Sequence, residues 1–359
     1  MILVIGAGIA GLSAAWRCAR AGAPVTVLEA GRAGQATSRV AAGYLEPGLA
    51  ADRLEDPQLP TDEWTSLRAY PDFVAGVEED SGHDVDFRAD GQLRLAFPEH
   101  EAAARADMAV RTVAGWAPEW LDGPALREFE PQLSPELAGA CFLPEVSWVD
   151  GRKLCAALTE ALRRRGALLR EETRVASLIL ESGAARGARL ETGEEVRADR
   201  VILATGWTLG GLANLPDELP APAPMRGVVL MLGMDPQTPF VTRICRSPDM
   251  TFLQPRAEGR LVVGVNRLPG DARPFADAGS VAAILEAAFR AAPAARTLPF
   301  LEAAWGVRPF LEGSGPVAAA SREAADLIYS VGYGSSGYLR APLWSQRAAD
   351  LALGRNVPA

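Results

Sequence analysis

The sequence has few histidines and cysteines among its 359 residues, and it has no long apolar run. Its two histidines, His83 and His100, lie in polar segments, which disfavours a histidine base or a metal centre. The four cysteines form no Cys-x-x-Cys pair, so neither a zinc site nor a redox dithiol is predicted. No stretch approaches the roughly 18 apolar residues of a membrane-spanning helix, and no targeting segment is visible before Ile2. We therefore expect a cytoplasmic protein with no bound metal and no membrane span.

A long basic run of the kind that binds nucleic acid is also missing. Arginine and lysine together number 36 against 45 acidic residues, which gives a formal net charge of -9. Because such a chain repels phosphate backbones, nucleic acid is not an expected partner. No Gly-x-Ser-x-Gly motif suggests a hydrolase either.

The first thirty residues have the pattern of a β-α-β unit. The apolar run Ile2–Ile5 is typical of a parallel strand buried on both faces. Helical sequence follows from Ile9 to Ala21 and ends at Gly22, and a second strand is expected over Val25–Leu28. This unit indicates one half of a dinucleotide-binding fold.

The loop between the first strand and the helix matches G-x-G-x-x-G. Gly6 permits the tight turn, Gly8 lets a diphosphate approach the backbone, and Gly11 lets helix and strand pack closely. The helix N-terminus offers free N–H groups to the phosphates. Glu29, at the end of the second strand, can accept hydrogen bonds from a ribose. A purely structural glycine turn is the alternative, but the full strand-helix-strand-acid context favours a nucleotide site.

This unit by itself could bind either FAD or NAD. FAD is favoured because the unit begins at residue 2 and because Thr205-Gly206, after the apolar strand 201–204, offers a second small-residue approach to a nucleotide. An acid at Glu29, where NADP sites use an arginine, argues against a 2′-phosphate.

The later segments predict an α/β protein, α+β overall. A Rossmann-like FAD-binding domain would comprise residues 1–80, 145–212 and 306–359, ending in a strand at 327–331 and a helix from about 342 to 353. A mainly antiparallel substrate-binding domain would be inserted as residues 81–144 and 213–305. The proline-rich stretch 216–224 is expected to cross between the two domains.

Nearly the whole chain resembles the D-amino-acid oxidase superfamily of flavoproteins, and within it the bacterial glycine oxidases. The resemblance rests on blocks that keep their order along the chain. These are residues 4–11, 27–31, 38–45, 90–96, 201–206, 259–264, 305–309 and 332–342.

The resemblance implies an FAD-dependent oxidase or dehydrogenase with the two-domain fold above. It implies FAD contacts from Gly6, Gly8, Ile9, Ala10, Gly11, Glu29, Ala30, Arg32, Ser38, Ala41, Ala42, Gly43, Val175, Thr205, Gly206, Arg308, Gly334, Ser335, Ser336, Gly337 and Tyr338. Some relatives attach FAD through a cysteine in the C-terminal third. Because no cysteine follows Cys245, we expect noncovalent FAD.

The family places its carboxylate-binding arginine in a Gly-x-Arg-Pro block, which carries over to Arg308 as the catalytic residue. A guanidinium can bind a carboxylate through two parallel hydrogen bonds and fix its orientation. A surface salt bridge is the alternative role.

Four positions of the expected substrate pocket depart from the glycine oxidase pattern. Phe252 stands where the family usually has a tyrosine, and Tyr333 opens a terminal turn that lacks the usual arginine. Arg267 stands in place of an apolar residue and could restore positive charge or face solvent. Glu46 could attract a cationic amine or be an exposed loop acid. These departures put glycine itself in doubt as the substrate.

The implied chemistry is hydride removal from the carbon that carries the amine of a small amine or amino acid, with the flavin as acceptor. No side-chain base is required, because the amine can lose its proton first. Oxygen or another electron acceptor would then reoxidise the flavin. A dehydrogenase that passes electrons to a quinone or carrier, a noncatalytic flavin-binding module and assembly into a homo-oligomer stay open.

Overall fold

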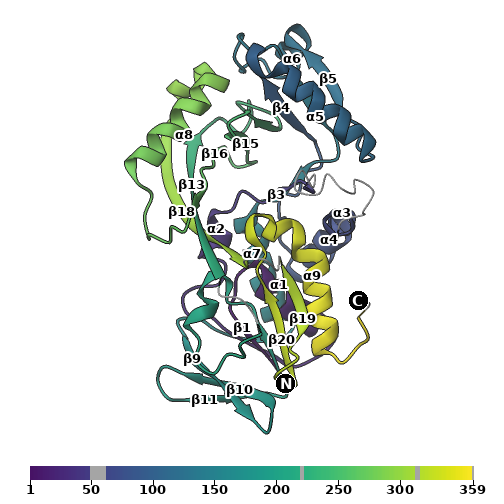
Figure 1. Cartoon of the computed structure of the whole chain (residues 1–359), viewed down its shortest axis with the longest axis vertical. Coiled ribbons are helices and arrows are strands. Elements are labelled where there is room, and N and C mark those ends of the chain that lie inside the picture. The colour runs from purple at the N-terminus through teal and green to yellow at the C-terminus, as the bar shows by residue number, and fades with distance from the viewer. Residues whose placement is uncertain (49–61, 219–221, 312–315, 358–359) are drawn as a thin grey trace.

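The computed structural model describes residues 1–48, 62–218, 222–311 and 316–357, and the chain is built around two large sheets (Figure 1). The first sheet has six strands in the order β19-β20-β12-β1-β2-β8. All its pairs are parallel except β19 with β20. Its strands are β1 (Ile2–Ile5), β2 (Val25–Leu28), β8 (Leu168–Arg170), β12 (Arg200–Leu203), β19 (Val317–Ala320) and β20 (Leu327–Val331).

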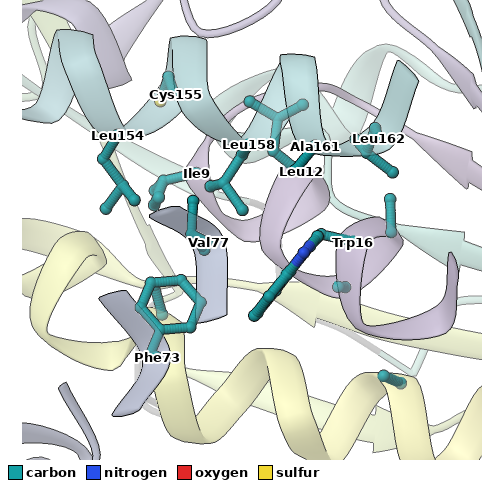
Figure 2. Packing of buried hydrophobic residues seen from close by; sticks show 14 of the residues in the cluster. Ile9, Leu12, Trp16, Phe73, Val77, Leu154, Cys155, Leu158, Ala161 and Leu162 are labelled. Atoms are coloured by element: carbon teal, nitrogen blue, oxygen red, sulfur yellow. The ribbon is translucent and has the colours of Figure 1, made fainter. Parts of the chain in front are cut away.

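The helices of this first domain pack on the sheet and on one another. They are α1 (Ile9–Arg20), α2 (Thr37–Val40), α3 (Asp62–Arg68), α4 (Tyr70–Ser81), α7 (Gly151–Arg164) and α9 (Gly337–Ala352). Figure 2 shows Leu12 and Trp16 of α1 between Leu158 of α7 and Phe73 of α4, all of them buried. Fully burying such a side chain stabilises the fold by about 1.5–3 kcal/mol. This packing holds the N-terminus of α1 in a fixed position beside the end of β1.

A small antiparallel sheet extends from the bottom of this domain in Figure 1. Its strands are β9 (Val175–Glu181), β10 (Ala184–Leu190) and β11 (Glu195–Arg197). Short 3-10 turns occur at η2 (Pro98–His100), η3 (Gly206–Gly211), η4 (Pro293–Thr297) and η5 (Gly334–Ser336).

The last helix corrects the sequence-based boundary. Helix α9 begins at Gly337, five residues before the expected start, and Pro342 lies inside it. Proline has no N–H, so it cannot bond the carbonyl four residues back, which belongs to Tyr338. The hydroxyl of Tyr70 donates to that carbonyl instead, at 3.2 Å. A tyrosine from α4 therefore satisfies the carbonyl that the proline leaves free.

The second large sheet forms the upper half of the molecule in Figure 1. Its strand order is β17-β13-β16-β15-β14-β4-β6-β5, and β18 also pairs with β13. The pair β14 with β4 is parallel and the others are antiparallel. The strands are β4 (Gln92–Ala96), β5 (Glu119–Asp122), β6 (Gly139–Leu143), β13 (Pro222–Gly233), β14 (Ile244–Arg246), β15 (Phe252–Pro255), β16 (Arg260–Gly264), β17 (Leu268–Pro269) and β18 (Phe300–Leu311).

The two faces of this sheet have different neighbours. One face packs on α8 (Ala278–Ala291) and α6 (Gly123–Phe129) through a large apolar cluster that includes Leu230 and Leu253. The opposite face covers α2 and the two-stranded pair β3 (Tyr44–Leu45) and β7 (Ser147–Trp148), and α5 (Glu101–Val113) lies at its edge. That second face is therefore turned toward the first domain.

Polar contacts join the two domains close to β18. The hydroxyl of Thr37 in α2 donates to the carbonyl of Val307 at 2.7 Å. Glu302 of β18 pairs with Arg39 at 2.7 Å and with Arg152 at 3.0 Å. No helix within the described ranges is long and apolar enough to cross a membrane. The domain boundaries at residues 81, 145, 213 and 306 stay a prediction, and β18 runs through the last of them.

Candidate functional site

The three glycines of the first loop have different structural roles. Gly6 has a φ of 101°, and a Cβ added there would lie 2.5 Å from the carbonyl oxygen of Ala204. A Cβ on Gly11 would lie 1.9 Å from the carbonyl oxygen of Gly6. A Cβ on Gly8 would meet only the hydroxyl of Ser38 within 4 Å, at 3.3 Å. Packing within the protein thus requires glycine at positions 6 and 11, whereas Gly8 leaves an open approach to the backbone, as a diphosphate needs.

Backbone N–H groups converge on the same opening. Helix α1 begins after Gly8 with no side-chain cap on that residue. The N–H of Ile9 donates to Ser38 Oγ at 3.0 Å, and Ala10 follows at a helix position whose N–H has no acceptor within the helix. This end of α1 therefore carries the positive end of the helix dipole and can bind an anion.

Glu29 lies at the end of β2, beside the glycine loop. Its Oε2 accepts from the N–H of Ala7 at 2.7 Å, and its Oε1 accepts from the N–H of Gly31 at 2.9 Å. Each carboxylate oxygen has two lone pairs, so both can accept one more hydrogen bond, as from a ribose hydroxyl. The backbone thus fixes the orientation of the carboxylate, and its contact with a ribose stays a prediction.

Other predicted FAD contacts lie at the same edge of the first sheet. Thr205 follows β12, and its hydroxyl is buried with no hydrogen-bond partner among the described residues. The next residue, Gly206, has a φ of 62° and nothing within 4 Å of an added Cβ. Val175 opens β9, just after Thr173, whose N–H donates to the carbonyl of Glu29 at 2.7 Å. The unpaired Thr205 hydroxyl and the open backbone at Gly8 are what a bound dinucleotide would complete.

Two predicted contacts lie on the exposed rim of this edge. Ala30 is exposed, and the side chain of Arg32 is 74% exposed and lies 3.8 Å from Glu172. Their side chains could reach only the outer end of a nucleotide.

The small-residue segment after α2 runs between the two domains. It comprises Ala41, Ala42 and Gly43, and Gly43 has a φ of 66°. The N–H of Val149 donates to the Gly43 carbonyl at 3.0 Å, and the buried Arg256 donates to the Ala42 carbonyl. The backbone carbonyls of this segment are therefore held by one backbone N–H and one guanidinium.

The terminal turn, with Gly334, Ser335 and Ser336 in a 3-10 conformation, leads into α9 at Gly337. The sequence analysis did not identify Arg340, which holds this turn in place. Arg340 donates to the Tyr333 carbonyl at 2.6 Å and to Glu63 at 2.6 Å. Because Glu63 is far away in the sequence, no local signal pointed to this arginine.

Two tyrosines of the predicted site are buried and make contacts within the protein. Tyr338 is buried, and its hydroxyl contacts the carbonyls of Ser38 at 2.8 Å and Gly151 at 2.9 Å, so its side chain joins α9 to α2 and α7. Only its backbone could contact FAD. Tyr333 is also buried, with its hydroxyl 2.8 Å from Ser330 Oγ and its ring edge-on to Trp344. Its contacts lie within the first domain and give no support to a role in the substrate pocket.

Arg308 lies on the face of the second sheet that is turned toward the first domain. A Cβ added at Gly306, two residues earlier on β18, would lie 3.3 Å from Thr37 and 3.4 Å from Val40 of α2, so this face looks onto α2. The Arg308 guanidinium extends over Gly227 of β13, where an added Cβ would lie 2.3 Å from its Nη2. Its only hydrogen bond among the described residues is a long one, 3.4 Å, to the carbonyl of Arg226.

Arg226, which is next to Arg308 in the sheet, has the acidic partners that Arg308 lacks among the described residues. Arg226, on the opposite face, is fully buried and pairs with Asp271 and Asp277 at 2.8 Å each. Arg308 has no carboxylate within 4.0 Å in the described part of the chain, so the surface salt bridge considered from the sequence is absent there. Burial and the nearby charge of Arg267 lower the pKa of Arg308 to about 10. Both effects favour binding of an anion, which would stabilise the charged form.

Phe252 is buried on the same face and stacks on Tyr44 of β3, with ring centroids 6.4 Å apart and planes inclined by 7°. The Tyr44 hydroxyl lies within hydrogen-bonding reach of Glu46 and of Gln92. Phe252 itself has no hydroxyl, and the nearby hydroxyl of Tyr44 already contacts Glu46 and Gln92.

Glu46 differs from both sequence interpretations. Its side chain is only 6% exposed, and it pairs with Arg94, with Arg246 at 2.8 Å and with Arg111 at 3.1 Å. Burial would raise its pKa, but the three guanidinium groups outweigh burial and lower it to about 2. Glu46 is therefore neither an exposed loop acid nor a free anion for a cationic amine. The partners come from β4, α5 and β14, so only the tertiary fold could reveal them.

Arg267 precedes β17 and has no hydrogen bond or ion pair among the described residues. The residue is exposed, although enough of its guanidinium is covered that burial, together with the charge of Arg246, lowers its pKa. Arg246, Arg267 and Arg308 together bring positive charge to this end of the sheet.

Comparisons with known proteins agree with this site. The family described as FAD dependent oxidoreductase, DAO, matches residues 1–351. The glycine oxidase of Bacillus licheniformis is 28% identical over 355 residues, covering 99% of this chain and 93% of that protein. The crystal structure of glycine oxidase from Geobacillus kaustophilus has a TM-score of 0.89 at 25% identity, covering 99% of this chain and 95% of the other. That from Bacillus cereus has a TM-score of 0.91 at 24% identity, with 99% and 95% covered.

The family match confirms the predicted α/β fold and the predicted cofactor, because it spans almost the whole chain and includes every segment of the nucleotide cradle. The open Gly8 backbone, the fixed Glu29 carboxylate and the Thr205 hydroxyl, unpaired among the described residues, are features that fit a bound dinucleotide. The chain belongs to the DAO family of FAD-dependent oxidoreductases and is a glycine oxidase-like member of it.

Proposed function

We propose that this protein oxidises a small amine or amino acid that carries a carboxylate, with noncovalently bound FAD and oxygen as the final electron acceptor. The observation that carries the proposal is the free guanidinium of Arg308 on the face turned toward the first domain. An unpaired, half-buried arginine next to a nucleotide cradle is a site for a planar anion.

FAD, when bound, supplies the acceptor for a hydride. The carbon that bears the nitrogen loses its C–H electron pair as that hydride, while the nitrogen lone pair forms a C=N bond and the amine proton goes to solvent. Water then adds to the imine and releases a carbonyl compound and ammonia or an amine. Two electrons and two protons reduce oxygen to hydrogen peroxide.

The protein's own residues position the substrate for this reaction. Arg308 binds the carboxylate, and the ring of Phe252 offers an apolar surface on the same face of the sheet. No histidine is required, since His83 is exposed and the substrate nitrogen can lose its proton to water. A cytoplasmic location and assembly into a homo-oligomer stay predictions.

Anaerobic reduction of the flavin tests the proposal. Glycine, sarcosine, D-amino acids and L-proline are each mixed with the protein, and loss of the yellow colour is followed. We expect bleaching by at least one carboxylated amine and none by the matching amine without a carboxylate. Arg308→Ala should abolish bleaching but retain FAD, measured by its absorbance after purification. Equal bleaching of the wild type and the variant would remove Arg308 from the mechanism.

The same bleaching experiment distinguishes two alternative functions, a dehydrogenase and a noncatalytic flavin-binding module. A dehydrogenase would be bleached by the amine but would form little peroxide in air while reducing an added dye. A noncatalytic flavin-binding module would not be bleached by any amine.

A further inference from the structure

We propose that the substrate carries a second carboxylate, which binds Arg267 and Arg246 while the first binds Arg308. This inference rests on the proposed function and narrows its substrate class. It is argued from the strand register, the charge balance at this end of the sheet and the partners of each arginine.

The register places Arg246 on the same face as Arg308. Residues paired across adjacent strands point to the same side of a sheet, and residues two apart along a strand do so too. Arg246 is paired with Phe252 and Phe252 with Gly264. The same row continues through Val229 to Ala304, which lies four residues before Arg308 on β18.

The register places Arg267 on this face as well. Leu268 is paired with Arg226, whose side chain points to the opposite face toward Asp271 and Asp277. Because side chains alternate along an extended strand, Arg267 points the other way, to the side of Gly227 and Arg308. The charge of Arg267 also lowers the pKa of Arg308, in accord with two guanidinium groups on the same face.

The local charges do not balance. Five arginines gather here against two acids; the arginines are Arg94, Arg111, Arg246, Arg267 and Arg308, and the acids are Glu46 and Asp107. The formal excess is three positive charges.

The partners show which of these charges remain available. Arg94 and Arg111 each contact both acids. Arg246 shares Glu46 through its Nη1, while its Nη2 meets, among the described residues, only the sulfur of Met250, at 2.9 Å. Arg267 and Arg308 have no acid partner among the described residues. Arg246 is thus half-compensated and the other two are uncompensated.

A substrate with a single carboxylate would neutralise one of these charges and leave like charges close together. A second carboxylate would relieve the repulsion and add charge-assisted hydrogen bonds. It could belong to an amino-acid side chain, as in aspartate or glutamate, or to a carboxymethyl group on the nitrogen, as in iminodiacetate. Both kinds of substrate carry two carboxylates and an oxidisable carbon–nitrogen bond, and both undergo the reaction written above.

Matched pairs of substrates test the inference in the FAD-loaded protein. The pairs are glycine with iminodiacetate, and alanine with aspartate and glutamate in both enantiomers. We expect kcat/KM to favour the dicarboxylate by about tenfold or more, the effect of one additional charge-assisted contact. The aspartate and glutamate arms report a side-chain carboxylate, and the iminodiacetate arm reports one on the nitrogen.

Arg267→Ala should reduce the ratio of dicarboxylate to monocarboxylate kcat/KM by about tenfold to a hundredfold. Arg267→Lys should retain part of that ratio, because it keeps the charge. Arg296→Ala, an exposed arginine of η4 that packs on Phe289 with the α8 layer, is the matched control and should leave the ratio unchanged. FAD content and melting temperature check that each variant folds.

Binding of unreactive acids provides a second readout. Succinate should shift the flavin absorption spectrum at a lower concentration than propionate, and Arg267→Ala should remove the difference. Preference for monocarboxylates, or an unchanged ratio in Arg267→Ala, would overturn the inference. Bleaching by monocarboxylates alone would leave the proposed function standing, whereas no bleaching by any amine would overturn both.

Discussion

The guanidinium of Arg308 occupies the space that a side chain at Gly227 would fill, with Nη2 2.3 Å from the position of an added Cβ. The two residues lie on adjacent strands, β18 and β13, and are two register positions apart. The absence of a side chain at Gly227 thus determines where Arg308 can lie.

Gly227→Ala should therefore displace Arg308 without removing it. We expect KM for a carboxylated substrate to rise by about tenfold, the loss of one well-aligned charged hydrogen bond, while FAD content stays unchanged. Steady-state kinetics measures this. Gly211→Ala is the control, because nothing lies within 4 Å of an added Cβ there. A KM for Gly227→Ala equal to that of the wild type would contradict the dependence of Arg308 on Gly227.

Substitutions in the glycine loop should separate binding from folding. Gly8→Ala should weaken FAD binding by about tenfold or more, since the methyl group would enter the open approach, and should change stability little. Gly11→Ala should lower the free energy of unfolding by about 1–3 kcal/mol, because its Cβ would overlap the backbone of Gly6. FAD titration and urea denaturation of the apoprotein distinguish the two. Equal losses of affinity and stability in both variants would argue against the separate roles.

Glu46→Gln should leave three arginines without their shared carboxylate. We expect the free energy of unfolding at pH 7 to fall by about 3 kcal/mol, as for other buried ion pairs that lose one partner. Glu286→Gln, at an exposed position of α8, is the control and should be nearly neutral.

The ionisation of Glu46 also predicts that the stability difference between the wild type and Glu46→Gln depends on pH. The pKa of Glu46 is lowered from 4.5 to about 2, so its ionisation stabilises the fold above pH 4.5. This contribution is lost as the pH falls from 4.5 toward 2. The stability gap between the wild type and Glu46→Gln should therefore narrow in acid, as measured by urea denaturation at pH 7, 5, 4 and 3. A constant gap over this range would show that folding does not lower the pKa of Glu46.

Tyr70→Phe should destabilise α9 by about 1–3 kcal/mol, because the Tyr338 carbonyl next to Pro342 would then be buried without a donor. The phenylalanine keeps the aromatic packing on Phe73 and Phe87, so a loss can be assigned to the hydroxyl. Thermal unfolding measures the effect. Tyr70→Phe,Pro342→Ala supplies the missing N–H and should recover much of the loss; no recovery would contradict this explanation.

The nucleotide cradle was predictable because its signals are local. The apolar run 2–5, the glycines of the loop and Glu29 lie within one β-α-β unit, and the structure places them as that unit requires. The expected start of α9 was wrong because Pro342 normally marks a helix boundary. The donor that permits it inside the helix, Tyr70, comes from α4 and could not be inferred locally.

The substrate side of the site was harder to predict, because it depends on pairing between distant strands. Glu46 was interpreted as a loop acid, and only the arrival of Arg94, Arg111 and Arg246 buries it. The role of Gly227 depends on its register with β18, some eighty residues later in the sequence. Patterns within one segment carry no information on such long-range partners.

The hydrogen bond from Thr37 to the carbonyl of Val307 anchors the strand one residue before Arg308 to the small helix beside the FAD cradle. Two further ties, from Arg39 and Arg152 to Glu302, hold the same strand farther along. These three side-chain contacts therefore set the distance between Arg308, which binds the substrate carboxylate, and the FAD cradle. The substrate can then bind to a preformed site without domain closure, because the positions of its two binding surfaces are set before either ligand binds.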